Sequence, residues 1–255
     1  FDKYALMESP CFAPELVSVP LMKFRPHMDK RNLFSLNWKF GAASKQVKQG
    51  TTPEELERLF LEWTARADAQ GWLEPQGVMA CFPAYAEGDD VVVLDVADRK
   101  TEIARFRFDI VIGANRDDLV SGAQYFRPKD SGRLDVIGVQ ISSAGPRVDD
   151  QLAKFKAGGD SEAGLFLQGL SDRIAEDMAE YVHQQLRARV GLGGGSQGTR
   201  WSPGYPAITR IAQNIDIHRL LGAQQKIGAR VTEAGEFFPT GCTAAVVSFH
   251  PDARY

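Results

Sequence analysis

The chain has 255 residues, and its 30 lysines and arginines against 33 aspartates and glutamates give a formal net charge of −3 at pH 7. Its 44% hydrophobic and 25% charged residues are ordinary for a globular protein, which excludes disordered, collagen-like and coiled-coil chains. The sequence lacks the basic excess typical of nucleic-acid binders and any apolar run near the roughly 20 residues that span a bilayer. We therefore expect no nucleic-acid partner and no membrane association.

The cysteine content and the two ends of the chain bear on its location. The three cysteines are odd in number and far apart, so they predict neither a disulfide framework nor a CxxC metal or redox site. The opening FDKYALMESP lacks the basic start and apolar core of a signal peptide. We expect a cytoplasmic protein. Since the sequence begins at Phe1 rather than Met and stops at Tyr255, we also expect one domain, residues 1–255, from a longer chain.

The first helix that the sequence predicts clearly covers residues 53–69. Thr52 suits the N-cap, Pro53 suits the first helical position, and Glu55 supports the cap. Apolar residues recur at helical spacing and form one stripe, namely Leu56, Leu59, Phe60 and Trp63. Gly71 is expected to end this helix.

Strands follow the first helix. The run GVMACFPAYAEGDDVVVLDV at 77–96 indicates a short apolar strand, a loop rich in Pro, Gly and Asp, and a second, β-branched strand. Residues 101–108 alternate imperfectly, which indicates an edge or paired strand. Residues 134–142 are short and β-branched and predict a further strand.

The longest helix is predicted from about Ser161 to Val190. Its apolar residues recur at spacings of three and four and indicate a face packed on a sheet; they are Leu165, Phe166, Leu170, Ile174, Met178, Tyr181, Val182 and Leu186. The glycine-rich run 191–198 then ends regular structure. A phosphate cradle would follow a strand and carry GK[ST]. This run follows a helix and lacks that motif, which favours a connector.

The remaining elements complete the fold class. A short amphipathic helix is predicted around 213–223, a turn at Gly228, and strands near 229–232 and 243–250. Strands grouped with a few long helices, without a regular βαβ rhythm, predict an α+β fold with a mainly antiparallel sheet. The four histidines lack paired spacing, so the sequence gives no support to a metal site. The one GxSxG match, at residues 194–198, lies in the glycine-rich run that follows a helix, whereas the nucleophile of a covalent hydrolase follows a strand.

The stretch Arg200-Trp-Ser-Pro-Gly-Tyr-Pro is the most unusual segment. Two prolines restrict its backbone, and Gly204 allows close approach to a ligand. Arg200 offers a planar fork suited to a carboxylate, and Tyr205 offers a flat face with a hydroxyl at its edge. The alternative is a surface turn with Tyr205 packed as an anchor. Residue types alone do not decide between the two.

Taken together, these residues resemble the activation domain of cobalamin-dependent methionine synthase, which binds S-adenosylmethionine. The family signature RxxxGYP corresponds to Arg200, Gly204, Tyr205 and Pro206, and the final FHPDARY matches its last segment. Further upstream matches are GVMACFPAYAEGDDVVV, YFRPKDSGRLDVIG and LSDRIAEDMAEYVHQQLR. The resemblance covers nearly the whole chain in the same order.

The resemblance implies a fold and a role. The fold is a C-shaped α+β domain with a twisted antiparallel sheet flanked by helices, in agreement with the periodicity. The role is reductive reactivation in a methyltransferase. S-adenosylmethionine remethylates oxidised cobalamin held by a neighbouring cobalamin-binding domain, while a flavodoxin-type or other reductase supplies an electron. Positioning is the main task, because a methyl on positive sulfur is already a good electrophile.

The resemblance also assigns site residues. Arg200 should pair with the carboxylate of the donor, and Asp29, in HMDKRNLF, should receive its ammonium group. Tyr205 and Tyr255 should line the site, and Gly204 should let the backbone approach the ligand. Glu176 matches an acidic position near the site, although a plain helix-surface charge explains it equally well.

Two other functions stay open at the level of the sequence. One is a stand-alone reactivator of another corrinoid methyltransferase. The other is a non-catalytic module that only docks the corrinoid domain or the reductase.

Overall fold

A seven-stranded sheet forms the middle of the molecule among the residues that this computed structural model describes, which are 10–40, 51–112, 119–193 and 197–254. Its strand order is β4-β3-β2-β7-β11-β8, with β1 paired to β2, and its ladders are antiparallel. The strands are β1 (Phe12–Ser18), β2 (Gln76–Glu87), β3 (Asp90–Leu94), β4 (Glu102–Arg107), β7 (Asp135–Ser143), β8 (Thr199–Trp201) and β11 (Cys242–Ser248). Two small antiparallel pairs accompany the sheet: β5 (Ile110–Ile112) with β6 (Leu119–Ser121), and β9 (Arg230–Val231) with β10 (Phe237–Phe238).

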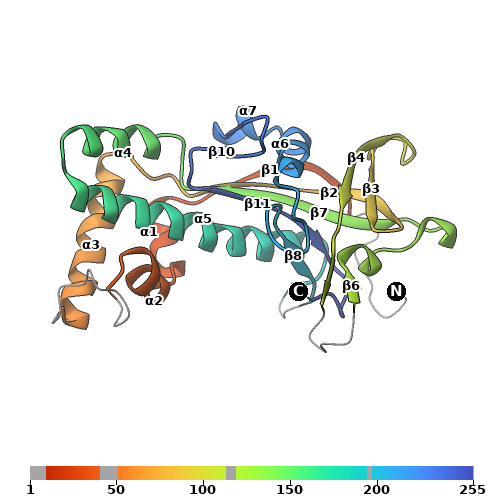
Figure 1. The fold of residues 1–255 in the computed structure, drawn as a ribbon, viewed down its shortest axis with the longest axis horizontal. Helices are drawn as coiled ribbons and strands as arrows, with labels where there is room; N and C mark the ends of the chain where they lie inside the picture. Colours follow the sequence, from red (N-terminus) through yellow and green to blue (C-terminus); the bar gives the residue numbers. More distant parts are fainter. Residues whose placement is uncertain (1–9, 41–50, 113–118, 194–196, 255) are drawn as a thin grey trace.

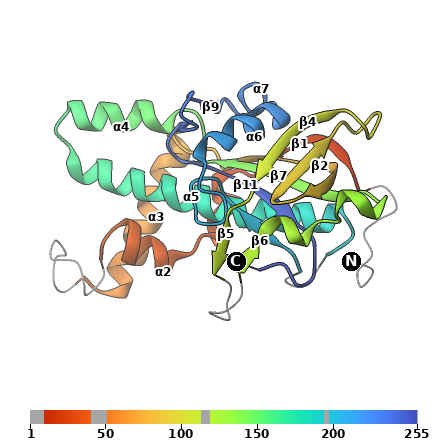
Figure 2. The same ribbon diagram turned by 45° about the vertical axis from the view of Figure 1, so that its right-hand side comes forward.

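Helices cover both faces of this sheet (Figures 1 and 2). The α-helices are α1 (Leu21–Phe24), α2 (Lys30–Asn32), α3 (Pro53–Ala69), α4 (Val148–Ala157), α5 (Ser161–Arg189), α6 (Asn214–Leu221) and α7 (Ala223–Ile227). Shorter helical turns lie at Arg25–His27, Leu33–Asn37, Gly122–Tyr125, Lys129–Ser131 and Ile211–Gln213. Helix α5 lies under β2, β7 and β11 and extends past the sheet to contact α3 and α4, while α6 and α7 lie above the sheet (Figure 1).

Strand alternation produces two cores. On β2, Met79 and Cys81 join the core beneath the sheet with α5, whereas Val78, Ala80 and Phe82 join the core above it with α6 and α7. Successive side chains of a strand point to opposite faces, so one strand serves both layers. Both faces of the central strands are therefore covered, and β2 is buried and apolar along most of its length.

The central strand β7 fixes the position of α5. Its side chains facing the upper core are apolar and unexposed, and burying each one fully contributes about 1.5–3 kcal/mol; they are Ile137, Val139 and Ile141. Its α5-facing side carries two polar residues instead, Gln140 and Ser142. Gln140 donates from Nε2 to the carbonyl of Ala179 at 2.8 Å, and Ser142 donates to the carbonyl of Ala175 at 2.8 Å. These two bonds fix the rotation of α5 about its own axis, because they keep the side of the helix that carries Ala175 and Ala179 against β7.

Most of the predicted elements are confirmed. Helix α3 begins and ends as expected, and its capping box is formed. The backbone N–H of Glu55 donates to the Thr52 hydroxyl, and the backbone N–H of Thr52 donates to the Glu55 carboxylate. Gly71 follows α3 with a φ of 60°. The predicted strand at 101–108 is β4, which lies at one end of the strand order. Together with the long α5, these elements confirm the α+β class with an antiparallel sheet.

One prediction about the second strand is wrong. Instead of a short strand and a loop, β2 runs without a break from Gln76 to Glu87, and the turn is confined to Gly88 and Asp89. Along one edge, β2 pairs with β1 as far as Cys81 and with β3 from Ala84 onward. Pro83 falls between these partners, where a missing N–H removes no hydrogen bond to either strand.

Candidate functional site

The motif segment begins on β8, and alternation on this strand aims Arg200 at α5. Trp201 is 1% exposed and packs in the upper core, with its ring edge-on to Phe108 at 5.4 Å and stacked near Tyr125 at 6.1 Å. The side chain before it must point to the other face of the sheet. Arg200 accordingly lies on the α5 side, where its Nε is 3.7 Å from a carboxylate oxygen of Glu180.

The chain then turns tightly at Gly204. This residue has a φ of +94°, in the left-handed region that favours glycine. Its N–H donates to the carbonyl of Ile208 at 2.7 Å, and the Ile208 N–H donates back to the carbonyl of Tyr205 at 2.9 Å. Ile208 is fully buried, whereas Tyr205 is 56% exposed. The interpretation of Tyr205 as a packed anchor is therefore wrong, since Ile208 fills that role and leaves the phenol ring free at the surface.

Asp109, just after β4, holds the residues that follow Tyr205 in this turn. Asp109 donates its backbone N–H to the carbonyl of Ala207 at 2.9 Å. Its Oδ2 accepts from both the backbone N–H and the hydroxyl of Thr209, each at 2.8 Å. These bonds hold the pKa of Asp109 below its usual range. The loop that carries Tyr205 is thus fastened at both ends.

These elements surround a pocket of about 290 Å³. It is lined by Glu176 of α5, Arg200 and Ser202 at β8, Tyr205, and Thr243 of β11. A second cavity of about 460 Å³ shares four of these residues and extends toward Asn214, Phe237 and Phe238. A guanidinium, a carboxylate, hydroxyls and an aromatic face on one continuous surface suit a zwitterion that also carries an apolar part.

The surroundings of Arg200 set its orientation. Glu180, whose side chain is 54% exposed, also accepts from Gln184 Nε2 at 3.3 Å and lies 3.9 Å from Nδ1 of the buried His183. The interaction with His183, followed by those with Gln184 and Arg200, lowers the pKa of Glu180 despite its partial burial. Arg200 itself is 26% exposed, so it is partly shielded from water.

Comparison with known proteins identifies the family. Residues 20–255 match the family model described as the activation domain of vitamin B12-dependent methionine synthase. The chain belongs to this family. The methionine synthases of Mycobacterium tuberculosis (25% identical over 260 residues) and Mycobacterium leprae (26% over 255 residues) match over 89% of this chain. This chain spans 21% of the length of each.

A solved structure shares the fold. The crystal structure of a MetH reactivation domain bound to AdoHcy superposes with a TM-score of 0.84 at 24% identity, covering 99% of this chain and 83% of that one. It confirms the α+β architecture derived above.

The predicted site residues are only partly brought together in this activation domain. Glu176, Arg200 and Tyr205 line one pocket, and Gly204 lies in the turn between Arg200 and Tyr205. Tyr255 lies outside the described residues, as do residues 194–196 of the glycine-rich run.

Asp29 lies against α5 but not among the residues that line this pocket. It caps α2: its Oδ1 accepts from the Asn32 N–H at 3.0 Å and its Oδ2 from the Asn32 side chain at 2.8 Å. Its backbone N–H donates to Asp177 at 2.8 Å, and Asp177 pairs with Arg173 at 2.9 Å. Burial raises the pKa of Asp177 in spite of these partners. The ammonium role of Asp29 remains a prediction.

Sequence reasoning missed three residues at the pocket. Ser202 and Thr243 line it, and Glu180 contacts Arg200. Glu180 could have been found, because it follows Glu176 by four residues and so shares its helix face. Thr243 carries no such signal, since its position depends on the pairing of distant strands.

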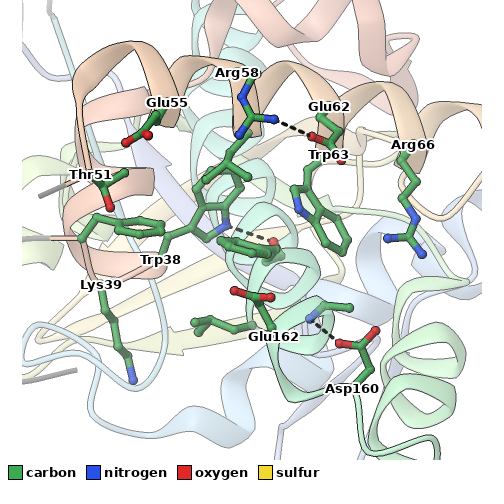
Figure 3. A pocket seen from close by; sticks show the side chains of 15 residues that line it. Trp38, Lys39, Thr51, Glu55, Arg58, Glu62, Trp63, Arg66, Asp160 and Glu162 are labelled. Carbon is green, nitrogen blue, oxygen red and sulfur yellow. Dashed lines mark hydrogen bonds and ion pairs between the residues drawn. The ribbon is translucent and has the colours of Figure 1, made fainter. Parts of the chain in front are cut away.

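A larger cavity of about 550 Å³ lies elsewhere, between α3 and the first turns of α5 (Figure 3). Its aromatic residues pack on one another: the Phe166 ring is 5.0 Å from Trp38 and 5.3 Å from Trp63. At its rim Arg58 pairs with Glu62 at 3.6 Å. Among the described residues, none of those predicted for the site lines this cavity, so the smaller pocket at the motif remains the candidate site.

The described residues lack two further features. Within them, no three His, Cys, Asp or Glu side chains gather in a way that could hold a metal ion. No helix in the described part of the chain is both long and apolar enough to cross a bilayer.

Proposed function

We propose that this domain binds S-adenosylmethionine in the pocket at Arg200 and presents it for the reactivation of cobalamin held by a neighbouring domain. The observation that carries the proposal is the meeting of Arg200, Glu176 and Tyr205 in one pocket. The related domain of the same fold was crystallised with AdoHcy, the product that remains when S-adenosylmethionine gives up its methyl group.

The residues of the pocket have distinct tasks. Arg200 holds the carboxylate of the donor through its two terminal nitrogens, since its Nε faces Glu180. Tyr205 presents an exposed ring against the nucleoside or the sulfonium, and Gly204 keeps the backbone beside it free of a side chain. The site therefore binds and orients the donor and leaves the chemistry to the bound groups.

The donor supplies an electrophilic methyl group on positive sulfur, and the reduced cobalamin of a partner domain supplies the nucleophile. With both groups bound, the methyl group would pass to cobalt and the sulfur would keep the bonding electron pair, which would leave AdoHcy. A reductase of the flavodoxin type or another type would have to supply an electron to the oxidised cobalt beforehand. In this proposal the domain, residues 1–255, is one module of a methyltransferase that spans several domains.

Titration calorimetry with S-adenosylmethionine and AdoHcy tests the proposal. Arg200→Ala should weaken binding by about 2 kcal/mol, or roughly 30-fold, because a charge-assisted pair is lost at a partly shielded site. Arg200→Lys should recover only part of this, since an ammonium lacks the planar fork. Arg58→Ala, on α3 and 70% exposed, is the matched control and should bind normally.

The same titration separates the alternatives. A folded wild-type protein that releases no heat with either ligand would contradict donor binding and leave only the docking module. A stand-alone reactivator would bind the donor and also restore a separate corrinoid methyltransferase in trans. Equal affinity of wild type and Arg200→Ala would show that the motif is misassigned.

A further inference from the structure

We infer that the outer face of the β5–β6 pair, formed by Ile110, Ile112 and Leu119, is the surface on which a cobalamin-binding domain docks. This inference rests on the proposed function, because it names where the partner that this function requires makes contact. The sequence predicted the partner domain but no residue that would touch it.

Pairing places the three side chains on one face. Ile112 lies directly opposite Leu119, and Ile110 precedes Ile112 by two residues on the same strand. Val111 and Val120 lie opposite each other on the other face and pack against the upper core. The pair therefore has one apolar face inside the fold and a second apolar face outside it.

The outer face is highly exposed to water. Leu119 is 73% exposed, Ile112 69% and Ile110 59%. In the described part of the chain, these are three of the four most exposed large apolar side chains, and Tyr205 of the candidate site is the fifth. Single exposed apolar residues are ordinary, but a group of them on one face is typical of a surface that a partner covers.

Both ends of the pair are attached to the segment that carries the motif. Asp109, directly before β5, donates its N–H to the carbonyl of Ala207 at 2.9 Å. The Trp201 ring lies between the ring of Phe108, before β5, at 5.4 Å and that of Tyr125, after β6, at 6.1 Å. A partner that rests on the pair is therefore also beside the candidate site.

The pair also projects toward the side of the molecule on which the site lies. Arg200 is on the α5 side of the sheet, where it contacts Glu180. In both views the β5–β6 pair and α2 project below α5 at separate places along it (Figures 1 and 2). A protein domain that reaches the pocket from this side meets the pair.

The size of the pocket indicates which partner this is. About 290 Å³ is at the low end of small-molecule sites, so the pocket suits part of the methyl donor but not a corrin ring. The cobalamin must meet the donor from outside the pocket while its own domain holds it. That domain must then cover the surface beside the pocket, where the outer face of the pair supplies apolar contact.

A second copy of this chain is the main rival. A stable complex of free chains buries about 800 Å² on each partner, more than three aliphatic side chains offer. A domain on the same chain needs a smaller face, because the connection raises its effective concentration. This chain spans 21% of the length of its methionine synthase relatives, so those proteins have ample length for such a domain.

Methyl NMR tests the inference, because it detects weak docking. The chain is labelled at its isoleucine and leucine methyl groups, saturated with AdoHcy, and titrated with the isolated cobalamin-binding domain of a vitamin B12-dependent methionine synthase. That domain carries cob(II)alamin, whose unpaired electron broadens the signals of nearby methyl groups. The same domain with diamagnetic cob(III)alamin is the reference.

Two variants and one control accompany the wild type. The variants are Ile112→Ser and Leu119→Ser. The control is Leu16→Ser on β1, where a leucine that is 53% exposed lies opposite Val78 of the upper core and so faces away from α5. Calorimetry with AdoHcy checks that each variant is folded and keeps its ligand site.

We expect the methyl signals of Ile110, Ile112 and Leu119 to broaden and those of Leu16 to stay sharp. Each serine variant of the pair should weaken docking by about tenfold, because one aliphatic side chain is no longer buried. The affinity for AdoHcy should change less than twofold, since the three residues are not among the described residues that line the pocket. Leu16→Ser should change neither affinity.

Three results would overturn the inference. Docking that is equally strong in the wild type and both serine variants, or broadening confined to other methyl groups, would place the partner elsewhere. Methyl shifts of the pair that grow with the concentration of this chain alone would assign the face to a second copy. A wild type that binds no AdoHcy would refute the proposed donor site, on which the choice of partner rests, and calorimetry records that result separately from docking.

Discussion

Two glycines of α5 should respond oppositely to the same substitution. An added Cβ at Gly169 would lie 2.5 Å from Cδ1 and 2.8 Å from Nε1 of the Trp38 indole. At Gly164, five residues earlier, a Cβ would meet nothing within 4 Å. Both positions belong to the same continuous helix, so the change in helix propensity is nearly the same for the two substitutions.

The magnitude follows from two terms. Replacing glycine by alanine within a helix stabilises it by up to about 1 kcal/mol. Forcing a methyl into a packed core costs about 1–3 kcal/mol, and the upper value applies here because Trp38 has little freedom to move. The indole is 2% exposed, donates to the Phe166 carbonyl at 3.0 Å, and packs edge-on against the Phe166 ring. Gly169→Ala should therefore destabilise the protein by about 2 kcal/mol, whereas Gly164→Ala should stabilise it by about 1 kcal/mol.

Urea unfolding followed by circular dichroism and tryptophan fluorescence measures both variants. The expected difference of about 3 kcal/mol is well above the error of such titrations. If Gly169→Ala proved as stable as Gly164→Ala, the close packing of α5 on the segment before residue 40 would be refuted. That packing matters for function because the same helix carries Glu176 and Glu180.

Three further predictions concern a cap, a loop and a thiol. Thr52→Ala should cost about 1 kcal/mol in urea unfolding, because the capping box with Glu55 is lost. Asp109→Asn should destabilise the protein at pH 7, because hydrogen bonds from Thr209 lower the folded pKa of Asp109. The difference from wild type should shrink as the pH falls below about 4 and vanish once the pH is below the lowered folded pKa. Cys242 is only partly buried, but desolvation raises its pKa to about 12, so this thiol should react with a disulfide reagent at pH 8 much more slowly in the folded than in the denatured protein.

Local signals predicted the long elements well. The apolar spacing of α5, the capping box of α3 and the β-branched run of β7 are contained within single segments, so their physics is visible in the sequence. The amphipathic helix predicted at 213–223 is in fact divided into α6 and α7 by Gly222, whose φ is 58°. A single glycine in a helical pattern does not reveal by itself which conformation it adopts.

Non-local pairing explains most of what the sequence missed. Strand β8 has three residues and exists because Trp201 and its neighbours pair with β11, almost fifty residues later in the chain. The uninterrupted course of β2 through Pro83 likewise depends on where β1 ends and β3 begins. Neither fact is contained in the local pattern of residues.

At the site, too, some residues are recognisable from the local sequence and others only from the fold. Arg200, Gly204 and Tyr205 lie in one contiguous motif, and the structure brings Arg200 and Tyr205 into one pocket. Asp29 lies in a motif as well, but its hydrogen bonds to Asn32 are visible only in three dimensions. Glu180 lies in the matching segment LSDRIAEDMAEYVHQQLR, but its contact with Arg200 is visible only in three dimensions.

Glu180 lies beside Arg200 because of the helical period of α5 and the alternation of side chains along β8. Hydrogen bonds from β7 hold the carbonyls of Ala175 and Ala179 against the sheet, and each glutamate lies one residue further along the helix. One residue turns the side chain by about 100°, so Glu176 and Glu180 project from the flank of α5 rather than into the core. On β8, burial of Trp201 in the upper core sends Arg200 to the opposite face. The charged residues around the pocket are thus positioned by the hydrogen bonds of β7 and by apolar packing of β8. A change that rotates α5 should weaken binding of the proposed donor without touching any charged residue.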